Sequence, residues 1–232
     1  MRVWDVNPGY LNRQSLLGEH RELHAIVSII RHNKKGYSRH PETLRWQGFG
    51  WALNQRHKLL VAEMNLRGFI DRSPVHLKTK NQKWPEVFVD LPAVQLKIIA
   101  GKYNNKEQGR IDLPKNVQEL WAQHQYSVMA RDDAEYKYLS GWVSARKSGK
   151  GIDEIYPELV SLLRCPPAEG NLRNTIQHMR DYVSAYVSLS GNTIESKTTR
   201  SLLAQIQDLA FLHNIVYLKE STALSELQAW TY

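Results

Sequence analysis

The residues best suited to chemistry lie at the start of the chain, where the α-amine of Met1 precedes an arginine–glutamate pair, Arg21 and Glu22. An α-amine has a reference pKa of about 7.7–8.0, against about 10.4 for lysine, so part of it is neutral and nucleophilic at physiological pH. It can attack the anomeric carbon of a deoxynucleotide and form an imine, which acidifies the neighbouring carbon and permits strand cleavage by β-elimination. Glu22 could move the protons, while Arg21 holds the carboxylate or a phosphate. The alternative is that this pair is an ordinary solvated helix surface.

The charge of the chain is concentrated in its first half. The net charge is +8, but residues 1–110 hold 19 Lys and Arg against 9 Asp and Glu, whereas residues 111–232 hold 12 against 14. A one-sided positive excess indicates binding to a polyanion, most simply nucleic acid, with a basic surface kept for solubility as the alternative. Basic and aromatic residues also alternate here, as expected where bases stack and phosphates bind. The predicted nucleic-acid-binding residues are Arg2, Arg13, Arg21, Lys34, Lys35, Tyr37, Arg39, His40 and Arg45.

Within that set, Arg2 is expected to act as a phosphate clamp and to lower the pKa of the neighbouring amine by like-charge repulsion. Tyr37 is the best stacking candidate because it lies in a basic loop, whereas Trp46 and Trp51 are expected in the core.

The composition also narrows the kind of protein. A single cysteine, Cys165, excludes an internal disulfide and indicates a reducing compartment, so we expect a cytoplasmic protein. No apolar run approaches the roughly 20 residues that span a bilayer. His20 and His24 stand four residues apart and could ligate a metal, but they lack the zinc-protease pattern. We therefore expect no metal site and no cofactor.

The apolar periodicity predicts an all-α protein with two helical domains. Residues 69–91 are expected to be mostly loop, and Gly and Pro residues separate the other segments. The predicted domains are residues 1–103 and 118–232, joined by a linker at 104–117. The predicted helices are 12–31, a short helix after Pro41, 51–66, 92–103, 116–130, 133–148, 153–164, 171–189 and 196–218.

Four short motifs in the first half carry a resemblance to a known family. They are Met1 to Arg13 and Gly36 to Pro41, shared with a bacterial branch, and Glu19 to Leu23 and Leu66 to Phe69, shared with a phage branch. Through them residues 1–69 resemble the pyrimidine-dimer DNA glycosylases of the endonuclease V type. The resemblance implies a compact helical enzyme that flips a nucleotide and combines glycosylase with lyase activity, on DNA rather than RNA.

The family's two catalytic positions fall on residues already singled out. Its N-terminal nucleophile corresponds to Met1 and its glutamate to Glu22. Two positions depart from the phage pattern. Arg2 replaces a small residue, which predicts that Met1 is retained, and Ala25 replaces an arginine near the glutamate.

The second half resembles the YbgA-like domain of unknown function over residues 118–189, through segments 120–131 and 174–182. Its polar residues on apolar helix faces are either buried packing residues or the lining of a base-binding groove. The candidates are His124, Tyr126, Arg131, His178, Arg180 and Tyr182. Besides the leading hypothesis of a DNA glycosylase and abasic-site lyase, two alternatives stay open. One is a non-catalytic DNA- or RNA-binding protein, and the other is an accessory protein in thionucleobase or tRNA metabolism.

Overall fold

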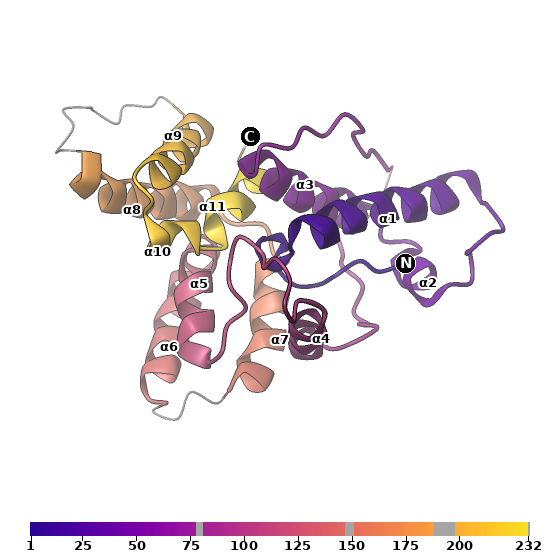
Figure 1. The fold of residues 1–232 in the computed structure, drawn as a ribbon, viewed down its shortest axis with the longest axis horizontal. Coiled ribbons are helices and arrows are strands. Elements are labelled where there is room, and N and C mark those ends of the chain that lie inside the picture. Colours follow the sequence, from indigo (N-terminus) through magenta and orange to yellow (C-terminus); the bar gives the residue numbers. More distant parts are fainter. Residues whose placement is uncertain (78–80, 147–150, 188–197, 232) are drawn as a thin grey trace. The chain divides into compact units, whose positions relative to one another are not determined.

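The computed structural model describes residues 1–77, 81–146, 151–187 and 198–231. The chain forms two compact units, Met1–Gly109 and Arg110–Tyr232. Throughout the described ranges the regular elements are helices (Figure 1), which confirms the predicted all-α class. Among the described helices, none combines the length and the apolar character needed to cross a membrane.

The first unit is organised around a long helix, α1, which packs against α2 and α3 (Figure 1). Asn12 caps the start of α1 by accepting a hydrogen bond from the Ser15 N–H, and Asn33 ends it in a left-handed conformation with φ of 48°. Both ends lie within one residue of the predicted 12–31. The elements of this unit are η1 (Pro8–Tyr10), α1 (Arg13–His32), α2 (Pro41–Trp46), α3 (Gly50–Leu66) and α4 (Pro92–Lys102).

The segment before α1 is part of the hydrophobic core. Five of its apolar side chains are buried: Val3, Trp4, Val6, Tyr10 and Leu11. Burying one such side chain contributes roughly 1.5–3 kcal/mol, so together they hold this segment in place. The sequence analysis treated the segment as the carrier of an amine and did not foresee that it packs inside the unit.

Three arginines from later in the chain bind the backbone of this segment. Arg45 donates to the Val3 carbonyl at 3.5 Å, Arg56 to the Val6 carbonyl at 2.9 Å and Arg67 to the Leu11 carbonyl at 2.7 Å. A carbonyl that is removed from water needs such a donor. The three guanidinium groups therefore make it possible to bury an irregular segment.

Residues near the end of the unit complete the packing around the same segment. The Gln95 side chain accepts a hydrogen bond from the Asp5 N–H at 2.8 Å, and the Tyr103 hydroxyl accepts one from the Asn12 N–H at 2.9 Å. Gly109 lies so close to Tyr10 that a Cβ would approach its carbonyl carbon to 2.5 Å. Residues as late as Gly109 therefore pack against the segment that precedes α1 and help to hold it in place.

The second unit contains the remaining helices. Its contacts are concentrated where α5 meets α6 and α7 and where α8 meets α9. The elements are α5 (Val117–Met129), α6 (Asp133–Ser144), α7 (Ile152–Leu163), α8 (Glu169–Val187), α9 (Thr199–Leu212), α10 (Val216–Lys219), α11 (Ala223–Glu226) and η3 (Leu227–Trp230).

The predicted helix over 196–218 is wrong near its end, where the structure has a break between two helices. Helix α9 ends at Leu212, and Asn214 takes a left-handed conformation with φ of 49°, which starts a new direction before α10. The predicted 133–148 ends early, at Ser144. Residues 147–148, 188–189 and 196–197 of the predicted helices lie outside the described residues.

Candidate active site

The extended N-terminal segment runs along one face of α1 and contacts two glutamates that lie one turn apart. The Arg2 N–H donates to the Glu22 carboxylate, and the Trp4 N–H donates to Glu19 at 3.1 Å. Residues two apart in an extended chain point to the same side, and residues three apart in a helix share a face. Because the two spacings match, Arg2 and Trp4 can each reach one of the two glutamates. The Glu22 carboxylate therefore binds the residue that directly follows Met1.

Glu19 and Glu22 differ sharply in their surroundings. Glu19 is 2% exposed and forms a two-pronged pair with Arg56, with N–O distances of 2.7 and 2.9 Å. Glu22 is only half-buried. Glu19 thus anchors the segment from inside the core, whereas Glu22 keeps part of its surface exposed to solvent.

His40 is the other side chain beside the amine. Its Nε2 lies 3.5 Å from the Met1 nitrogen, and its Nδ1 accepts a hydrogen bond from the Glu42 N–H at 3.2 Å, which caps α2. Because Nδ1 accepts, the proton of a neutral imidazole is on Nε2, facing the amine. The sequence analysis predicted only nucleic-acid contact for His40.

Arg2 is held by neighbouring groups within the first unit. Its guanidinium pairs with Asp90 at 2.6 Å and lies over the Trp4 ring, 4.4 Å from the centroid. Its side chain is about one quarter exposed. The predicted phosphate clamp is therefore a partly covered, ion-paired group.

The loop between α1 and α2 presents four of the nine predicted binding residues to solvent. Tyr37 is 72% exposed and takes a left-handed conformation with φ of 56°, and its ring lies 6.4 Å from that of His40. Lys34, Lys35 and Arg39 are exposed in the same loop. His40 ends this loop beside Met1, and the Lys34 ammonium donates to the Ser28 hydroxyl on α1 at 2.8 Å.

Two predicted binding residues do not fit that role. Arg45 is buried and pairs with Asp5, so no phosphate can reach it. Arg13 is exposed but lies over the Phe69 ring, nine residues before Glu22 on α1. Nine residues amount to roughly 13 Å and half a turn, so Arg13 faces away from the amine. Arg21, by contrast, is exposed next to Glu22.

A comparison with known protein families gives a match in the part of the chain that contains Met1 and Glu22. Residues 1–77 match the family of pyrimidine dimer DNA glycosylases. The matched segment holds the amine, Glu22 and the basic loop, but it covers less than half of the chain. No curated protein and no solved structure gives a match. The family match ends at residue 77, so the resemblance of the second half to the YbgA-like domain stays a prediction.

The second-unit candidates differ in burial, and two of them, Tyr126 and Tyr182, contact the same ring, Tyr217, with centroid distances of 5.9 and 4.8 Å. Arg131 is buried, pairs with Glu226 at 2.6 Å and donates to the carbonyls of Leu163 and Cys165. His124 is fully buried. Tyr126 is buried as well, while Tyr182, His178 and Arg180 are wholly or partly exposed, with Arg180 paired to Asp181. His124 and Arg131 are thus buried packing residues, as one of the two alternatives predicted, and a role in base binding for the exposed candidates stays a prediction.

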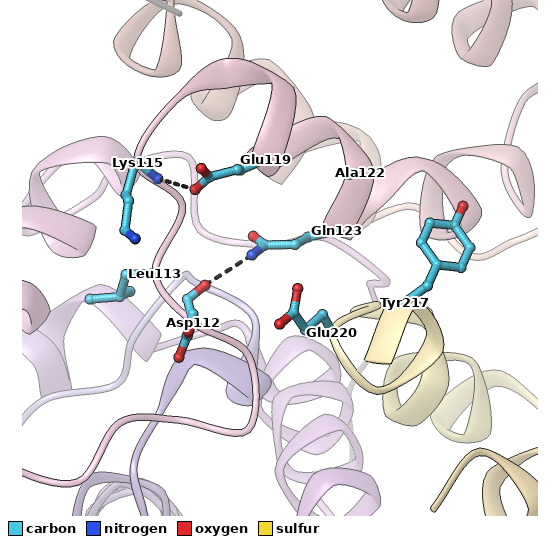
Figure 2. Close-up of a pocket in the computed structure, with 8 residues that line it drawn as sticks. All are labelled: Asp112, Leu113, Lys115, Glu119, Ala122, Gln123, Tyr217 and Glu220. Atoms are coloured by element: carbon cyan, nitrogen blue, oxygen red, sulfur yellow. Dashed lines mark hydrogen bonds between the residues drawn. The ribbon is translucent and has the colours of Figure 1, made fainter. Parts of the chain in front are cut away.

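A pocket of the second unit lies elsewhere, between α5 and α10 (Figure 2). Its volume is about 300 Å³, and the Gln123 side chain crosses it to donate to the Asp112 carbonyl at 2.9 Å. Three acidic side chains outnumber one lysine, so the pocket does not favour phosphate. The lining residues are Asp112, Leu113, Lys115, Glu119, Ala122, Gln123, Tyr217 and Glu220, none of which the sequence analysis singled out.

Burial of His124 predicts a loss of stability in acid. Burial and the nearby Arg131 charge lower the pKa of His124 from 6.5 to about 3. Because the unfolded histidine binds its proton near pH 6.5, this contribution to stability is present above that pH and is lost as pH falls toward 3. Between pH 7 and pH 4 it amounts to on the order of 3 kcal/mol. Urea unfolding of wild type and of His124→Gln over that range should show a weaker pH dependence in the variant.

Proposed function

We propose that the first unit is a DNA glycosylase with abasic-site lyase activity, in which the Met1 α-amine is the nucleophile and Glu22 the proton-transfer group. The proposal rests on one observation above all: the Glu22 carboxylate binds the N–H of Arg2, the residue that follows the amine. The family match over residues 1–77 supports the same reading. The substrate class is damaged DNA, with a pyrimidine dimer as the first lesion to test.

The reaction follows from these two groups. The neutral amine attacks C1′ of the nucleotide, and the C1′–base bond breaks with its electron pair leaving on the base, which takes up a proton. The sugar ring opens to an imine between the amine nitrogen and C1′. Glu22 then removes a proton from C2′, and the C3′–O bond breaks, expelling the 3′ phosphate. Water releases the sugar fragment and restores the amine.

The surroundings of the amine suit this chemistry. His40 Nε2 lies 3.5 Å from the Met1 nitrogen, so we assign His40 as a residue that positions the amine. We assign Tyr37 to stacking on a base and the exposed cations Lys34, Lys35 and Arg39 to flanking phosphates. Arg21 is assigned to the phosphate next to Glu22.

Borohydride trapping tests the proposal directly. Reduction during incubation with an abasic-site oligonucleotide should convert the imine to a stable amine and leave a protein–DNA adduct on residue 1. Peptide mapping by mass spectrometry locates the adduct, and the intact mass shows whether Met1 is retained. A version extended at the N-terminus by a short tag, which replaces the amine with an amide, should give no adduct.

Other results would count against a lyase. Salt-dependent binding of the oligonucleotide with no adduct favours the non-catalytic binding protein, because phosphate contacts alone give that dependence. An adduct mapped to an internal lysine would overturn the role of Met1. Release of a thio-substituent from a modified nucleobase would favour the thionucleobase alternative.

A further inference from the structure

Three histidines and an aspartate of the first unit converge on the side of α1 that faces α3. His20 and His24 lie one turn apart on α1, His57 comes from α3, and Asp71 follows α3. One potential ligand atom from each of the four lies within 4.8 Å of all the others. The sequence analysis weighed His20 and His24 alone and expected no metal site, since nothing in the sequence connected them to His57 and Asp71.

The spacing of these atoms is that of a coordination shell. Nε2 of His20 lies 3.3 Å from Nε2 of His24 and 3.3 Å from Asp71 Oδ1, and His57 Nε2 lies 3.6 Å from Asp71 Oδ2. Four ligands at about 2.0–2.1 Å in a tetrahedron around zinc are separated by about 3.3–3.4 Å. Three of the separations between the four residues are therefore close to those of a tetrahedral shell, and the others are no longer than 4.8 Å.

An unpartnered nitrogen points to a missing ligand. The His57 side chain is 7% exposed, and its Nε2 is buried without a hydrogen-bond partner among the described residues. A buried polar atom without a partner is costly unless something binds it.

We propose that His20, His24, His57 and Asp71 bind one divalent transition-metal ion of the zinc class. Three imidazoles with one carboxylate favour such an ion over Mg²⁺ or Ca²⁺, which prefer oxygen ligands. With four protein ligands the shell is closed, as in structural zinc sites. The ion ties the segment after α3 to the α1–α3 pair.

The metal site is separate from the amine. Along α1, His20 and His24 lie about 160–200° around the helix axis from Glu22, on the opposite flank. The proposal therefore does not depend on the lyase function. Trapping of DNA on Met1 should persist in the presence of a chelator, so the two proposals can fail independently.

Zinc titration of the full chain tests the site. The protein is prepared without a polyhistidine tag, stripped with a chelator and titrated with Zn²⁺ by calorimetry in a non-coordinating buffer. We expect one ion per chain, and a rise in Tm of about 5–10 °C at a zinc concentration well above the Kd. Co²⁺, used as a spectroscopic probe, should give the intense visible bands of a four-coordinate ion.

Variants locate the ion. Asp71→Asn, which keeps the shape of the side chain, and His57→Gln should each weaken binding by at least about 100-fold and abolish the rise in Tm. His32→Gln, at the exposed end of α1, and Cys165→Ser, which removes an exposed thiol, should bind zinc as wild type does. If His57→Gln fails to fold, Asp71→Asn decides.

Two results would overturn the proposal. One is a wild-type protein that takes up no stoichiometric zinc, in which case the four residues form only a hydrogen-bonded cluster. The other is binding that is unchanged in Asp71→Asn, or lost in Cys165→Ser, which would place the ion elsewhere.

Discussion

Replacing Glu22 by glutamine should reduce cleavage of an abasic-site oligonucleotide by about 10²–10⁴-fold while leaving its binding within a factor of two or three. The amide keeps the size of the side chain and can still accept a hydrogen bond from the Arg2 N–H, so the N-terminal segment stays in place. It cannot remove the C2′ proton. Single-turnover cleavage and a binding titration at the same salt concentration measure the two effects.

Two controls make this result specific. Glu107→Gln changes an exposed carboxylate near the end of the first unit and should cleave as wild type does. Borohydride trapping by Glu22→Gln at long incubation times separates the steps, because an adduct that forms without cleavage shows that imine formation survives. Full cleavage activity in Glu22→Gln would remove Glu22 from the mechanism.

Replacing Arg56 by methionine should destabilise the first unit by about 3–5 kcal/mol. The substitution removes a fully paired guanidinium and leaves the Glu19 carboxylate buried against the Trp4 N–H alone. Burial raises the pKa of Glu19, and the charge of Arg56 opposes that shift. Without Arg56 the carboxylate should take up a proton, and the Val6 carbonyl loses its donor. Urea unfolding followed by circular dichroism measures the loss.

A second variant separates charge from packing. In Arg56→Met combined with Glu19→Leu no buried charge remains, so part of the lost stability should return, but the Trp4 N–H and the Val6 carbonyl still lack partners. Arg21→Met, on the exposed side of α1, should change stability by no more than about 0.5 kcal/mol. A loss of that small size in Arg56→Met would show that the buried pair is not a main support of the unit.

The sequence was sufficient to predict those parts of the fold that depend on residues close together along the chain. Helix α1 lies within one residue of its predicted position because its apolar periodicity and its capping asparagine, Asn12, are local signals. The break at Asn214 was missed because the segment around it has apolar residues at helical spacing, and a left-handed residue leaves only a weak sequence signal.

The candidate sites were harder to predict because each is formed by residues that are distant in sequence. Arg45 looks like any other cation of the first half until Asp5, 40 positions earlier, is seen to pair with it. His57 and Asp71 could join the pair on α1 only after the packing of α1 against α3 was known. One local signal was present, since Arg56 and Arg67 are 11 residues apart, about three turns of the predicted helix over 51–66 and its end.

The anchoring of the first eleven residues has a consequence for how the protein is made. The ribosome synthesises this segment well before its partners Arg56, Arg67, Gln95 and Tyr103. Contacts that are so far apart in sequence form late in folding. During translation the segment therefore lacks these contacts, and it takes its place only when the whole first unit has left the exit tunnel.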